Sequence, residues 1–71
     1  MIADRIRQAR LAAGLTLGAL GEQVGVSHTA IQKYEKGLLT PSSSQLLKLA
    51  RACGIRTEYF FRTHTVELLQ S

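Results

Sequence analysis

Glycines recur along this sequence at intervals that leave room only for short helices. Apolar side chains with helical spacing precede Gly14, and the clearest such stripe, through Leu46, Leu49 and Cys53, stops at Gly54. Glycine readily adopts the left-handed conformation that ends a helix, so both positions are natural stops. This alternation of amphipathic stretches and stops predicts an all-α fold built from several short helices.

The same pattern gives five expected helices within one domain, because 71 residues are too few for two domains. Hydroxyl residues, which favour helix starts, precede most of the apolar stretches. We expect helices from about Ile2 to Ala13, from Thr16 to Val24, from His28 to Lys36, one that Ser42 or Ser43 caps and Gly54 ends, and a short last one that Thr57 caps and that carries Tyr59, Phe60 and Phe61. The domain is expected to span residues 1–62, with residues 63–71 as a C-terminal tail.

The charge of the chain favours a polyanionic partner. Nine lysines and arginines stand against five acids, which gives a net charge of +4 and an isoelectric point near 9.9. Nucleic acid is the commonest partner for such a balance. No apolar run is long enough to cross a bilayer, and Cys53, the single cysteine, cannot form an internal disulfide. We therefore expect a cytoplasmic protein that does not enter a membrane.

The sequence contains few of the residue types that catalysis or metal binding requires. The chain holds one cysteine, two histidines and five acids. A nucleophile needs a base within hydrogen-bond reach, and Cys53 lies on an apolar stripe, where a small buried hydrophobe is the simpler interpretation. His28 and His64 are far apart in sequence, and no pair of His or Cys residues has metal-site spacing. The sequence therefore predicts no enzyme, no metal and no cofactor.

The segment from 16 to 37 carries the functional signal. Two short helices joined by a tight, glycine-containing turn form a helix-turn-helix, whose second helix enters the DNA major groove. On a wheel at ~100° per residue, Ala30, Ile31 and Tyr34 gather on one side of the second helix, and Glu35 lies at the border. The opposite arc holds polar side chains and no acid: His28, Thr29, Gln32, Lys33 and Lys36.

This polar arc suits the reading of base edges. Lys33 can donate to guanine O6 and N7, and Gln32 can bond bidentately to adenine N6 and N7. The methyl of Thr29 can touch a thymine methyl, and Ser27 with the helix N-terminus can hold a phosphate. A merely solvated helix face would also be polar, but the tight turn and the absence of acids favour contact with DNA.

Several motifs follow one another at a spacing typical of a known family. They are I-R-Q-A-R at 6–10, G-L-T at 14–16, L-G-E-Q-V-G-V-S at 20–27, A-I-Q-K-Y-E-K-G at 30–37, P-S at 41–42 and L-L-K-L-A-R-A-C-G-I at 46–55. Residues 5–61 thereby resemble the lambda-repressor/Cro-like, or xenobiotic-response-element, helix-turn-helix family. The resemblance implies a compact five-helix domain that binds specific duplex DNA. It assigns base and phosphate contacts to Ser27, His28, Thr29, Gln32 and Lys33, and a backbone contact to Lys36.

The resemblance also gives two residues a structural role. In relatives, the residues that match Arg10 and Glu35 form an ion pair inside the domain. Both residues border the apolar side of their expected helices, which agrees with a structural role for the pair.

The sequence departs from the family pattern at three places. Many relatives carry glutamine at the position of Leu17, where it touches a phosphate, so this contact is either lost or made by the hydroxyl of Thr16. Relatives usually have alanine at Gly21, and we expect glycine to weaken the junction between the two helices. The alternative is that Gly21 is needed because another backbone approaches closely at this position. Leu38 and Leu39 stand where some relatives place cations against the DNA backbone. We expect these differences to affect the strength of DNA binding.

Together these features predict a bacterial or phage-type transcriptional regulator, a repressor, that binds double-stranded DNA through residues 28–36. We expect a homodimer on a palindromic operator, because so small a domain offers few contacts. The fifth helix is the expected dimer contact, since its three aromatic rings cannot all face one core and at least one should be exposed. The alternative is a protein-interaction module, antitoxin-like or an adaptor, in which DNA contact is secondary.

Overall fold

The computed structural model describes residues 2–61, and over these residues it confirms the predicted all-α architecture. Its helices are α1 (Ile2–Ala12), α2 (Leu17–Val24), α3 (His28–Lys36), α4 (Ser43–Cys53) and α5 (Glu58–Phe61). None of these helices is long and apolar enough to cross a membrane. The tail expected at residues 63–71 lies outside the described residues.

Hydroxyl side chains cap three of the helices. Oγ1 of Thr16, before α2, accepts a hydrogen bond from the backbone N–H of Ala19 at 3.0 Å. In the same way Ser27 caps α3 and Ser42 caps α4, each with a hydrogen bond of 3.2 Å. Ser42, rather than Ser43, is therefore the cap of α4. A cap of this kind stabilises a helix by about 1 kcal/mol, because it satisfies a backbone donor that has no partner within the helix.

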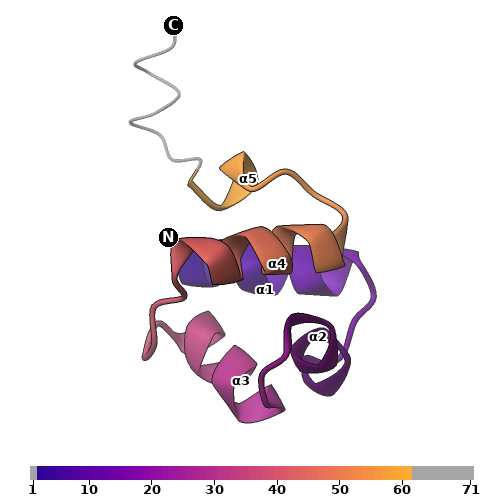
Figure 1. Cartoon of the computed structure of the whole chain (residues 1–71), viewed down its shortest axis with the longest axis vertical. Coiled ribbons are helices and arrows are strands. Elements are labelled where there is room, and N and C mark those ends of the chain that lie inside the picture. The colour runs from indigo at the N-terminus through magenta and orange to yellow at the C-terminus, as the bar shows by residue number, and fades with distance from the viewer. Residues whose placement is uncertain (1, 62–71) are drawn as a thin grey trace, which may run out of the picture.

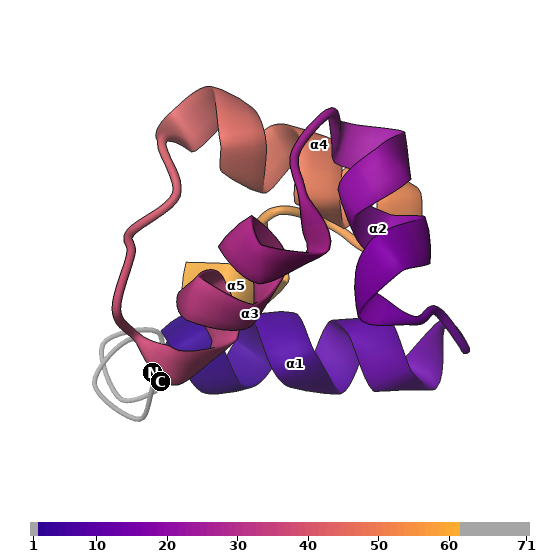
Figure 2. The ribbon, with the colours of Figure 1, turned by 90° about the horizontal axis from the view of Figure 1, so that it is seen from below.

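Every helix sends one large side chain into a shared core. α1 and α4 form a middle layer with α2 and α3 on one side and α5 on the other (Figure 1), and the view from below shows α2 and α3 in front of the space between α1 and α4 (Figure 2). The largest fully buried side chains come one from each helix: Ile6, Leu20, Ile31, Leu49 and Phe60. Because each of these helices contributes to the core, the position of α3 is fixed by packing against side chains from the other helices.

The junction of α2 and α3 corrects one expectation. A Cβ atom at Gly21 would lie 2.5 Å from the carbonyl oxygen of Val26 and 3.2 Å from two backbone atoms of Ser27. The turn therefore packs directly against the backbone of α2, and the amide of Val26 donates a 2.8 Å hydrogen bond to the carbonyl of Gly21. The expectation that glycine weakens this junction is wrong, because here the missing side chain is what allows the close approach.

Candidate nucleic-acid interface

Helix α3 has one buried side and one exposed side. Ile31 and Tyr34 pack into the core with 0% and 7% of their surface exposed. Figure 2 views the molecule from the side on which α3 lies nearest the reader. The α3 residues expected from the sequence to contact DNA are all exposed, and we call them the recognition face: His28, Thr29, Gln32, Lys33 and Lys36.

The recognition face carries hydrogen-bond donors and positive charge but no acid. Lys33 and Lys36 supply two ammonium groups, and Gln32 supplies an amide that both donates and accepts. Glu35, the only acid in α3, is partly buried and is occupied within the fold. A surface with this composition attracts a phosphate backbone and can form hydrogen bonds with base edges.

Two exposed hydroxyl groups stand at helix starts near this face. Ser27 precedes α3, and Thr16 precedes α2. Each hydroxyl oxygen already accepts a backbone N–H of its own helix, at 3.2 Å and 3.0 Å respectively. The hydroxyl proton remains available, so each group can still donate a hydrogen bond to an anion. The positive end of the helix dipole favours the same partner.

The structure brings Arg10 and Glu35 into a two-point ion pair. Nε of Arg10 donates to Oε2 of Glu35 at 2.6 Å, and Nη2 donates to Oε1 at 3.1 Å. Nη1 donates to the carbonyl of Leu15 at 2.9 Å, which ties the loop after α1 to the same group. The hydrogen bonding of Arg10 to the Glu35 carboxylate raises the pKa of Arg10. The pair joins α1 to α3 and neutralises the one acid next to the recognition face.

Leucines occupy the three positions where the family pattern places polar or charged groups. Leu17 is partly buried and packs against the core, so its side chain is not directed toward a phosphate. Leu38 and Leu39 follow α3 and are 72% and 45% exposed. The end of the recognition face is therefore bordered by apolar surface.

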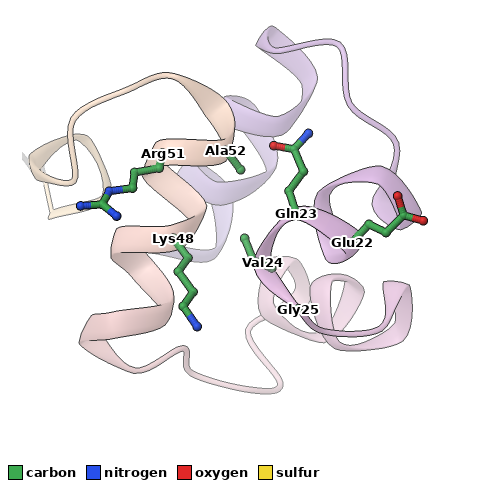
Figure 3. A pocket seen from close by; sticks show the side chains of 7 residues that line it. All are labelled: Glu22, Gln23, Val24, Gly25, Lys48, Arg51 and Ala52. Carbon is green, nitrogen blue, oxygen red and sulfur yellow. The ribbon is translucent and has the colours of Figure 1, made fainter.

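A second group of charged residues was not found from the sequence. Lys48 and Arg51 on α4 line a hollow whose other wall is the C-terminal end of α2. Figure 3 shows Lys48 extending beside this hollow and Arg51 pointing away from it. These residues belong to separate helices and to no motif, so only the folded chain brings them together. Periodicity alone could have marked Lys48 and Arg51 as exposed, but it could not have shown what lies opposite them.

The candidates for metal binding or nucleophilic chemistry are Cys53 and the His, Asp and Glu side chains. Over residues 2–61 no group of three His, Cys, Asp or Glu side chains is placed to hold a metal ion. Cys53 is partly buried and packs against the core. Burial raises the pKa of the Cys53 thiol, because the thiolate would lose its hydration.

Comparison with known proteins identifies the family. The HTH_3 helix-turn-helix model matches residues 6–60, which include all of the recognition face and both partners of the ion pair. The chain belongs to this helix-turn-helix family. The resemblance noted in the sequence is thus confirmed, together with the five-helix, repressor-like fold.

Relatives and solved structures of this helix-turn-helix family agree with the assignment. An uncharacterized transcriptional regulator in the ATPase CF(0) region of Rhodospirillum rubrum is 40% identical over 60 residues, which cover 84% of this chain and 56% of that protein. The solution structure of the DNA-binding domain of the P22 C2 repressor superposes with a TM-score of 0.82 at 33% identity, covering 86% of this chain and 80% of that domain. The structure of the biofilm regulator SinR in complex with DNA gives a TM-score of 0.80 at 30% identity, covering 87% of this chain and 100% of the chain in that structure.

The match to curated relatives covers only part of their length. This chain spans about half of each of the first several relatives, from 42% to 56%. The shared part is the helix-turn-helix domain.

Proposed function

We propose that this chain is the DNA-reading domain of a transcriptional repressor and that α3 enters the major groove of duplex DNA. The observation that carries the proposal is the recognition face: an exposed, acid-free, donor-rich surface on a helix whose other side is fixed in the core. The solved structures of P22 c2 repressor in complex with a synthetic operator and of SinR in complex with DNA support the proposal, because their folds match this one closely.

Within this proposal the recognition face has separate tasks. Gln32 and Lys33 lie on the exposed side of α3 and read base edges, Gln32 preferring adenine and Lys33 guanine. His28 and Thr29 lie in the first turn of α3, the part of a recognition helix that contacts bases most directly. Substitution of any one good base contact is expected to cost about 1–3 kcal/mol of discrimination.

Phosphate contacts fix the position of the domain on the duplex. Ser27 and Thr16 donate hydroxyl protons from helix starts, and Lys36 places its ammonium at the far end of α3. Such contacts are independent of sequence, but they set the orientation in which α3 meets the bases. Thr16 takes this role because Leu17 is packed against the core.

The proposal includes a homodimer on a palindromic operator, with α5 as the contact between copies. Phe60 is buried, but Phe61 is 48% exposed, as expected for one of three successive aromatic residues. Tyr59 is held against α1, since its hydroxyl donates to Oε1 of Gln8 at 3.0 Å and Arg5 lies 5.0 Å from the centre of its ring. A rigid α5 with one exposed ring offers an apolar contact to a second copy.

The decisive experiment combines selection with a salt series. Bound duplexes are first selected from a random pool, and affinity for the selected site is then measured by fluorescence anisotropy at increasing salt. We expect a palindromic site and a linear fall of log K with log salt. Gln32→Ala should relax preference at one position of the site, whereas Lys36→Ala should weaken all duplexes and reduce the salt slope by about 0.9.

Arg56→Ala is the matched control for lost charge. Arg56 lies between α4 and α5, and its side chain is 89% exposed in a loose 3.6 Å pair with Glu58. This variant removes the same charge as Lys36→Ala from a position that makes no proposed contact with DNA, so its salt slope should equal that of the wild type. A slope near zero for the wild type, or no enriched sequence, would reject DNA reading and favour the protein-interaction module.

A further inference from the structure

A hollow of about 510 Å³ separates the C-terminal end of α2 from the middle of α4. Lys48 and Arg51 line it from α4, Glu22 and Gln23 line it from α2, and Gly25 lines it from the turn that follows α2 (Figure 3). All five are exposed at the surface. One wall of the hollow therefore carries two cationic residues, and the opposite wall is the end of a helix.

The hollow lies next to the reading end of α3. Gly25 lines it and belongs to the turn that leads, through Val26, into the cap residue Ser27. In helix-turn-helix proteins the first residues of the recognition helix meet the bases. The major groove is bounded by phosphate backbones about 12 Å apart, so phosphates lie close to the end of any helix that enters the groove.

The charges on α4 are not used by the fold. Neither Lys48 nor Arg51 forms an ion pair within residues 2–61, where the pairs are Arg10 with Glu35 and Arg56 with Glu58. Glu22 is the acid on the opposite wall, but its side chain points away from both cations in Figure 3. In the same view Lys48 extends along the side of the hollow, whereas Arg51 points away from it. Lys48 is thus the cation better placed to reach a ligand in the hollow.

We propose that Lys48, with Arg51 adding to the local positive charge, binds phosphates of the DNA that flank the half-site read by α3. The inference rests on the function proposed above and extends the footprint of the domain from α3 onto α4. The hollow has room for the sugar-phosphate chain to approach α4, and the positive wall complements its charge. The negative charge of Glu22, on the α2 side of the hollow, reduces the attraction of the phosphates to Lys48.

The test compares two duplexes that share the same half-sites. One ends at the last base pair of the selected site, and the other carries additional flanking base pairs at both ends. We expect Lys48→Gln to reduce the salt slope on the long duplex by about 0.9, and to leave the slope on the short duplex unchanged. Glu22→Gln should strengthen binding to the long duplex only. Arg56→Gln, the matched control, should change neither duplex.

The outcomes separate this inference from the function on which it rests. Equal slopes for the wild type and Lys48→Gln on the long duplex would overturn the inference while leaving DNA reading intact. A change in self-association without a change in slope, measured by sedimentation, would also overturn it and would make the hollow an interface between copies. Absence of salt-dependent binding by the wild type would overturn both. Circular dichroism of each variant checks that the exposed substitutions leave the fold unchanged.

Discussion

Removal of the Glu35 carboxylate should destabilise the domain far more than removal of any exposed acid. The side chains of Arg10 and Glu35 are 12% and 7% exposed, so Glu35→Ala leaves a largely buried guanidinium with only the Leu15 carbonyl as acceptor. Loss of one partner of a buried pair costs about 3–5 kcal/mol. Because Arg10 retains the Leu15 contact and some hydration, we expect the lower end, about 3 kcal/mol.

That loss is large for a domain of this size. At roughly 0.05–0.15 kcal/mol per residue, a chain of 71 residues has a free energy of unfolding of roughly 4–10 kcal/mol. A cost of about 3 kcal/mol therefore removes about a third or more of the stability and lowers the melting temperature by roughly 12–24 °C. Urea titration and thermal melting, both followed by circular dichroism, measure the two quantities independently.

Two further variants show whether the pair itself is responsible. Arg10→Met combined with Glu35→Leu replaces both charges by apolar groups of similar length, and most of the stability should return, since no charge is left without a partner. Glu58→Ala removes an acid from the exposed pair with Arg56 and should produce no measurable change. If Glu35→Ala melts at the same temperature as Glu58→Ala, the ion pair does not hold α1 to α3.

Three other substitutions or reactions give results of known sign. Gly21→Ala should lower the melting temperature although alanine favours helices, because its Cβ would lie 2.5 Å from the carbonyl oxygen of Val26. Gly18→Ala is the control in the same helix: a Cβ there has nothing within 4 Å, so this variant should raise stability by up to about 1 kcal/mol. A gain in stability for both variants would contradict the close approach at Gly21. Leu38→Lys places a cation on a 72% exposed position beside the recognition face and should increase DNA affinity with a salt slope steeper by about 0.9; an unchanged slope would show that the loop does not reach the backbone. Burial raises the pKa of Cys53, so less thiolate is present at mildly alkaline pH. The folded protein should therefore react with a disulfide reagent more slowly than the urea-unfolded chain. Equal rates would mean that the thiol is as hydrated in the folded protein as in the unfolded chain.

The helices could be predicted from the sequence because their ends are specified locally. A capping hydroxyl and a left-handed glycine each act within one turn of chain, as Ser27 and Gly37 do at the two ends of α3. The exposed side of α3 followed in the same way, since helical periodicity separates Ile31 from Gln32 without reference to any other element. In α1, Leu11 lies on the opposite side of the helix from the buried residues Ile6 and Ala9, and it is accordingly 53% exposed.

Contacts between helices were predicted less well, because they depend on distances that no local pattern records. Family likeness suggested that Gly21 weakens its junction, yet the turn at Val26 comes so close that a side chain at this position would collide with it. Lys48 and Gly25 line one hollow only because α2 and α4 pack together. Helical periodicity can mark Lys48 as a surface position, but it cannot relate Lys48 to Gly25 in another part of the chain.

The Arg10–Glu35 pair links the stability of the domain to the charge of its DNA-facing side. Glu35 is the only acid in α3, and an unpaired carboxylate there would repel the phosphates that Lys33 and Lys36 attract. Pairing with Arg10 removes that repulsion and at the same time fixes α3 to α1. The helix therefore obtains its position and its electrostatic character from one contact. It follows that a variant such as Arg10→Met should impair DNA binding even at temperatures where the domain remains folded, because Glu35 then stands uncompensated next to the recognition face.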